Sequence, residues 1–213
     1  MRLRLGTLGG MRMAAALGLA SAALAVTLAP APAAAQFMSA GYKFLDAVKK
    51  ADGEEVEKAI GATPTIVNTK DVTTGDTALN LVAQRRDLTW LRFLLAKGAN
   101  PNLRNDKGVG PLAIAVNLGW TDGVQELVTS GARVNDPDGS GETPLIAAVH
   151  RRNVDLVRLL VKAGADPLRA DNSGRSAHDY AELLGKDSPL VAELDTAAKA
   201  AAAKRARSYG PSF

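Results

Sequence analysis

Glycine recurs along this chain with a fixed spacing of 33 residues, and this period constrains the fold more than any other feature. A first series of equally spaced glycines comprises Gly75, Gly108, Gly141 and Gly174. A second series with the same spacing comprises Gly98, Gly131 and Gly164. Two interleaved series with one period do not arise by chance in ordinary sequence. The chain is therefore predicted to consist of tandem copies of one structural unit.

Each unit carries start and stop signals for two helices. In one unit, Thr143 is suited to cap a first helix, and Pro144 takes the first helical position, where a missing N–H costs nothing. Asn153 is suited to cap a second helix, and Gly164 ends it in the left-handed conformation that glycine tolerates best. The equivalent caps in other units are Thr77, Asp87 and Ser176. A turn and two antiparallel helices cannot bury their own apolar face, so neighbouring units are predicted to stack.

These units resemble ankyrin repeats, on motifs such as Gly141-Glu-Thr-Pro-Leu145 and Gly98-Ala-Asn-Pro-Asn102. The resemblance implies an all-α solenoid of stacked helix-turn-helix units, about five in number with degenerate units at both ends. The implied repeat domain spans residues 42–207, and a disordered tail of residues 208–213 follows it. Its units are placed at residues 42–72, 73–105, 106–138, 139–171 and 172–207.

The chain also departs from the family pattern. Ankyrin repeats usually have histidine after the Pro-Leu pair, and this chain has other residues at that position: Asn80, Ala113, Ile146 and Asp179. A weaker hydrogen-bond lattice between turns is therefore expected. Unit 106–138 is expected to open most easily, because Gly110 replaces the capping threonine and Gly123 stands where an apolar residue belongs. A helical glycine costs about 0.5–1 kcal/mol relative to alanine.

The first 35 residues have the order of a secretory signal peptide. Residues 2–12 are basic without an acid, residues 13–29 are apolar and uncharged, and small residues follow at 33–35 after two prolines. Cleavage after Ala35 would leave residues 36–41 as a short linker. The alanine-rich composition of this segment is typical of bacterial signal peptides, so we expect the protein to be periplasmic or secreted. An uncleaved anchor stays open as an alternative, although about 17 apolar residues is the short limit for a bilayer.

Composition excludes several classes of function. The chain has no cysteine and only two histidines, His150 and His178, so a metal site would be hard to assemble. No phosphate-binding loop, Gly-x-Ser-x-Gly elbow or His-Glu-x-x-His motif occurs, so we predict no enzyme activity, cofactor or metal. Loss of the three arginines in the signal lowers the formal charge from +4 to +1, which argues against nucleic acid as a partner.

The resemblance implies a concave face, lined by turn tips and first helices, that contacts a protein partner. The turn-tip residues are Asp76, Val109, Glu142 and Arg175. The ends of the first helices carry Gln84, Arg85, Asn117, Leu118, His150 and Arg151. With Arg86 and Arg152, the arginines form two basic clusters, and Leu118 and Trp120 between them could supply an apolar centre. Ordinary solvation of these side chains stays open, and His178 is expected to pack in the core or a turn.

Signal and repeats together predict a non-catalytic protein–protein interaction module in the periplasm. It is expected to be a monomer without stable membrane insertion after cleavage. One alternative is an envelope or membrane-surface scaffold that uses the basic end of the last helix, at Lys204, Arg205 and Arg207. Cations also suit a helix C-terminus, so these residues have a structural explanation as well. A second alternative, implied by resemblance alone, is an accessory factor in oxidative-stress defence.

Overall fold

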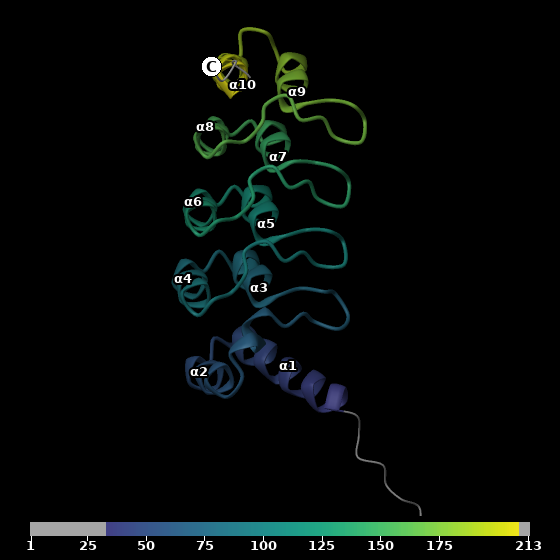
Figure 1. Cartoon of the computed structure of the whole chain (residues 1–213), viewed down its shortest axis with the longest axis vertical. Coiled ribbons are helices and arrows are strands. Elements are labelled where there is room, and N and C mark those ends of the chain that lie inside the picture. The colour runs from purple at the N-terminus through teal and green to yellow at the C-terminus, as the bar shows by residue number, and fades with distance from the viewer. Residues whose placement is uncertain (1–32, 209–213) are drawn as a thin grey trace, which may run out of the picture. The chain divides into compact units, whose positions relative to one another are not determined.

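The computed structural model describes residues 33–208, which form five pairs of helices stacked in one direction (Figure 1). Odd-numbered helices form one column and even-numbered helices form the other. The α-helices of this range are α1 (Ala33–Lys50), α2 (Gly53–Ala62), α3 (Ala78–Arg85), α4 (Leu88–Ala96), α5 (Pro111–Asn117), α6 (Thr121–Thr129), α7 (Pro144–His150), α8 (Val154–Lys162), α9 (Ala177–Leu183) and α10 (Pro189–Ser208). A 3-10 helix, η1 (Pro64–Asn68), follows α2. The predicted all-α solenoid of stacked helix pairs is confirmed.

The glycines of both series share one backbone conformation, with positive φ, which recurs every 33 residues. Glycines of the first series have φ between 71° and 85°, and those of the second series have φ between 87° and 91°. Both ranges lie in the left-handed region, which side chains with a Cβ atom rarely adopt. The first series forms the turns before the odd-numbered helices, and the second ends α4, α6 and α8.

The predicted helix caps form as expected. The hydroxyls of Thr77, Thr143 and Ser176 accept hydrogen bonds from backbone amides in the first turns of α3, α7 and α9. The side chains of Asp87 and Asn153 do the same for α4 and α8. Helix α5 begins at Pro111, and Gly110 before it provides no side-chain cap, as the sequence predicted.

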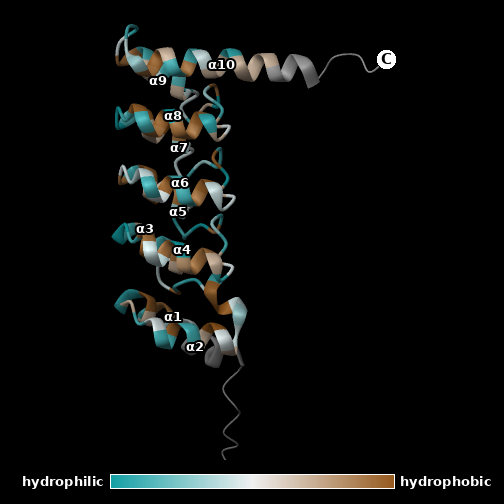
Figure 2. Cartoon of the chain, turned by 90° about the vertical axis from the view of Figure 1, so that its left-hand side faces the viewer, coloured by the Kyte–Doolittle hydropathy of each residue, from teal (hydrophilic) through white to brown (hydrophobic). Residues whose placement is uncertain are grey.

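The core runs the length of the stack between the two columns of helices. It is built mainly from aliphatic side chains, and its buried aromatic residues within the described range are Phe44 and Trp120. Leu79 and Leu145 occupy equivalent places in their units, and Leu194 of α10 buries the last unit. Figure 2 shows the even-numbered helices lying one above another, with α10 reaching well past the ends of α4, α6 and α8.

Asparagine side chains join successive units by a hydrogen-bond pattern that the sequence analysis missed. The Nδ2 atoms of Asn68, Asn102 and Asn135 donate to the carbonyls of Gly98, Gly131 and Gly164, at 3.3, 3.1 and 3.1 Å. Their Oδ1 atoms accept from the backbone amides of Asn100, Arg133 and Asp166, at 2.7, 2.8 and 2.7 Å. The position 33 residues after Asn135 holds the exposed Leu168, which has no side-chain amide to continue the pattern. Each asparagine therefore fixes the turn that ends the next unit.

Among the described positions where ankyrin repeats usually have histidine, Asn80 links two successive turns by hydrogen bonds. Asn80 is fully buried, and its Nδ2 donates to Asp76 Oδ1 at 3.1 Å and to the carbonyl of Val109 in the next turn at 3.4 Å. Ala113 and Ile146 have no polar atom for this bond. Asp179 instead forms a capping box with Ser176.

The predicted linker is corrected by the structure, since residues 36–41 lie within α1. Alanine has the highest helix propensity, and residues 33–40 contain neither glycine nor proline, so the helix continues through the expected boundary. Ser208, placed in the predicted tail, is the last residue of α10. Residues 1–32 of the predicted signal and residues 209–213 lie outside the described range. Within that range, no helix has both the length and the apolar character to cross a bilayer.

Trp120 and Gly123 correct two further expectations. Trp120 is 9% exposed, so it does not form an apolar centre on the surface. A Cβ atom on Gly123 would lie 2.1 Å from Cε3 of the indole. The ring therefore fills the space of the missing side chain, and Gly123 is a packing partner of Trp120 rather than a packing defect.

We expect Gly123→Ala to destabilise the chain by about 1–3 kcal/mol, because the added methyl overlaps the indole. In a Trp120→Ala background the same substitution should stabilise by about 0.5–1 kcal/mol, because alanine favours a helix over glycine. Urea unfolding of the four chains measures both effects. An effect of the same sign in both backgrounds would contradict this packing.

Candidate functional site

The predicted contact residues lie along the column of odd-numbered helices and its turns (Figure 1). Each of the four units that follow the first contributes three positions: the turn-tip residue and the residues five and eight positions after it. The last two are three residues apart, so they lie on the same side of the first helix. We call these three rows of positions the inner face. Its members are Asp76, Leu81 and Gln84; Val109, Ile114 and Asn117; Glu142, Ala147 and His150; and Arg175, Tyr180 and Leu183.

The centre of the inner face is apolar. Leu81, Val109 and Ile114 are each half-buried, from two neighbouring units. Gln84 and Asn117 lie beside them, exposed and without a side-chain hydrogen bond to any described residue. Leu81 and Ile114 were not among the predicted contact residues. Their constant offset from the turn tip is the sequence signal that could have identified them.

The two predicted basic clusters differ in what their arginines do. Arg85 Nη1 donates to the carbonyls of Val48 and Lys49, at 2.6 and 2.9 Å, at the C-terminal end of α1. The guanidinium of Arg86 donates to the carbonyl of Leu118 in the next unit. These two side chains join units. Arg151, by contrast, is exposed and makes no side-chain hydrogen bond within the described range.

Two acidic turn tips are also engaged inside the repeat array. Asp76 Oδ1 accepts from Asn80 Nδ2 at 3.1 Å and from Asn105 Nδ2 at 2.9 Å, which ties two successive turns together. Glu142 Oε1 lies 2.7 Å from His150 Nδ1, so these two predicted contact residues form a pair along α7. Leu118 is half-buried and packs against the core.

Tyr180 is the aromatic residue of the inner face, and the sequence analysis missed it. Its hydroxyl donates to Asp171 Oδ2 at 2.8 Å, and its ring packs edge-to-face on His150 with centroids 4.5 Å apart. The guanidinium carbon of Arg175 lies 5.9 Å from the ring centroid, within cation–π range. Hydrogen bonds from the hydroxyls of Ser173 and Tyr180 hold the pKa of Asp171 far below its usual range. The inner face therefore ends in an ordered aromatic and charged cluster.

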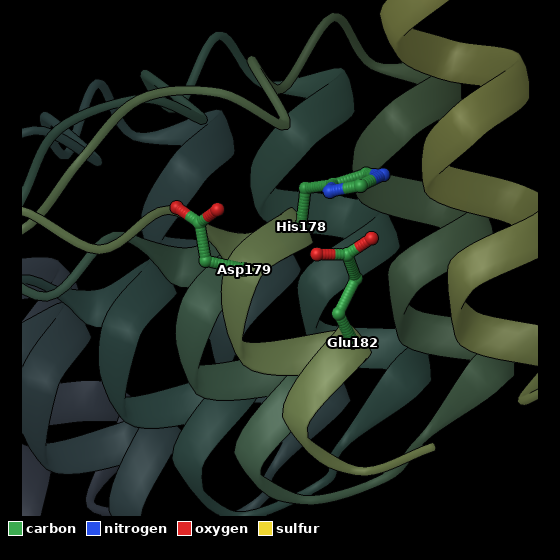
Figure 3. Close-up of side chains that lie close together, drawn as sticks. All are labelled: His178, Asp179 and Glu182. Carbon is green, nitrogen blue, oxygen red and sulfur yellow. The ribbon is translucent and has the colours of Figure 1, made fainter. Parts of the chain in front are cut away.

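One group of potential metal ligands occurs among the described residues, on helix α9 (Figure 3). It comprises His178, Asp179 and Glu182. His178 is half-buried between α9 and α10, and its Nε2 lies 2.7 Å from Asp195 Oδ1. The predicted packing role of His178 thus takes the form of a polar contact with the last helix.

Two family models match the chain. One, described as ankyrin repeats (3 copies), matches residues 44–138, and the other, described as ankyrin repeats (many copies), matches residues 127–181. The chain belongs to the ankyrin repeat family. The predicted ankyrin-repeat solenoid is confirmed, and the ankyrin family is a non-catalytic scaffold whose repeats bind protein partners.

We expect Arg85→Ala to lower the free energy of unfolding of this ankyrin repeat protein by about 1–2 kcal/mol, because two carbonyls at the end of α1 lose a charged donor. Arg151→Ala is the matched control and should change it by less than about 0.5 kcal/mol. Urea unfolding measures both. Equal losses would contradict the different roles assigned to the two arginines.

Proposed function

We propose that this ankyrin repeat protein is exported to the bacterial periplasm and binds a protein partner there through the inner face, without catalysis of its own. The observation that carries the proposal is the apolar centre of Leu81, Val109 and Ile114. Beside it lie the exposed side chains of Gln84 and Asn117, which make no hydrogen bond to a described residue. Protein-binding sites commonly combine such a centre with a polar rim.

The outer parts of the inner face fit a protein partner as well. Arg151 lies exposed at one edge, and its side chain donates no hydrogen bond to the described part of the chain. The Tyr180 ring offers an ordered aromatic surface between His150 and Arg175. Tyrosine and arginine contribute strongly to binding energy at protein interfaces. Asp76 and Arg85 contribute differently, because their side chains hold the scaffold on which the surface is displayed.

Export is supported by the position of the signal-like segment relative to the packed chain. Residues 1–35 carry the basic, apolar and small-residue regions in the order of a secretory signal. Among residues whose side chains the structure describes, the first buried position is Gly41 and the first large buried side chain is Phe44. A cut after Ala35 would therefore leave these core positions in the mature chain.

We expect Asn117→Arg to weaken partner binding at least tenfold without loss of stability, since the exposed side chain lies beside the apolar centre. Gln125→Arg places the same new side chain on α6 of the same unit, away from the inner face, and should leave binding unchanged. The partner is first captured from periplasmic extract, purified and identified, and its Kd is then measured for the three chains. Equal affinity of Asn117→Arg and the unchanged chain would contradict use of the inner face.

Export is tested separately. We expect the chain expressed with its own N-terminus to appear in the periplasmic fraction and to begin at Gln36 on N-terminal sequencing. Replacement of Ala35 by a bulky charged residue should block the cut, because the peptidase needs a small side chain there. Recovery of the uncleaved chain in the cytosol would contradict export to the periplasm.

A further inference from the structure

Helix α9 brings three metal-ligating side chains to one place. The ligand atoms of His178, Asp179 and Glu182 lie within 4.8 Å of one another. Figure 3 shows the carboxylate of Glu182 directed toward the ring of His178, as expected for two residues one helical turn apart. Ligand atoms around a tetrahedral metal are about 3–3.5 Å apart, so small side-chain rotations would close the set.

A fourth side chain orients the imidazole. Asp195 belongs to α10, and its Oδ1 lies 2.7 Å from Nε2 of His178. A neutral ring that donates its Nε2–H to this carboxylate keeps the lone pair on Nδ1, which is then the ring nitrogen available to a metal ion. Metal-binding histidines nearly always donate their second ring N–H to a carboxylate or carbonyl in this way.

Both carboxylates keep an oxygen atom that makes no hydrogen bond to a described residue. Asp179 Oδ2 accepts from the backbone N–H and the hydroxyl of Ser176, which lowers the pKa of the Asp179 carboxyl group. Its other oxygen, Oδ1, makes no hydrogen bond to a described residue. Glu182 is exposed and has no hydrogen-bond partner in the same range. Arg175 and Lys186 are the nearby cations, since both line the same surface pocket as Asp179 and Glu182.

We propose that His178, Asp179 and Glu182 bind one divalent first-row transition metal ion, with Zn²⁺ as the best fit, and that Asp195 positions the histidine. An imidazole nitrogen disfavours Ca²⁺ and Mg²⁺, which prefer oxygen ligands. Three protein ligands leave a fourth position for water or for a side chain of a partner. The sequence predicted no metal site, because the chain has no cysteine and only two histidines. In the structure, the carboxylates of Asp179 and Glu182 complete a ligand group around a single histidine.

The chain is well suited to testing this site, because it has two histidines and no cysteine. Zn²⁺ is titrated into the purified chain by calorimetry, and the ring protons of both histidines are followed by NMR. We expect one ion per chain and a shift of the His178 signals. His178→Asn and Glu182→Gln should each weaken binding at least tenfold, and Asp195→Asn should weaken it about 10–100-fold. His150→Asn is the matched control and should bind like the unchanged chain.

Glu182→Gln should not disturb folding, because Glu182 is exposed and its side chain has no hydrogen-bond partner among the described residues. A loss of metal binding in this variant therefore reports on the metal site itself. This variant should unfold at the same temperature as the unchanged chain without metal. With Zn²⁺ the Tm should rise for the unchanged chain and not for the variant. Absence of binding below millimolar Zn²⁺, full binding by Glu182→Gln, or an equal loss in His150→Asn would overturn the proposal.

Discussion

The structure depends on the fact that no helix pair in it can bury its own apolar face. Each pair gains its core only by contact with the pairs before and after it, so burial is shared along the whole stack. Hydrogen bonds reinforce this packing at the same interfaces. Asn68, Asn102 and Asn135 each bridge to the glycine turn of the following unit. The equivalent position in the fourth unit holds Leu168, so this asparagine bridge does not join the fourth unit to the last.

Shared burial also decides which polar side chains are free to contact a partner. In a stacked array the first neighbour that a side chain meets is the next unit. The Arg85 side chain donates hydrogen bonds to the two carbonyls at the end of α1. Arg151 holds the equivalent position two units later, and its side chain makes no such bond within the described range. Equivalent positions therefore have different roles, and the inner face is a mixture of scaffold contacts and free groups.

The last described helix pair differs from the others in its second helix, α10, which is much longer than α4, α6 or α8. Helix α10 packs against α8 and α9 and buries Leu190 and Leu194 against the stack. It also brings Asp195 to His178, a contact that no other unit has an equivalent for in the described range. The end of the array thus combines ionisable groups that the regular repeats keep apart.

The sequence by itself determined the repeat, the helix pairs, their caps and the left-handed glycine turns. These features are local: a cap lies three residues from the amide that it accepts from, and a glycine conformation needs no distant partner. The match of 44–181 to ankyrin families follows from the same local signals.

Tertiary structure decided everything that depends on where a side chain points and which unit it meets. Arg85 reaches a carbonyl 37 residues away, and the Trp120 indole turns inward because Gly123 leaves room for it. His178 and Asp195 meet only because α10 folds back across α9. A period of 33 residues fixes which positions are equivalent, but the contacts that give equivalent positions different roles form only when the units stack.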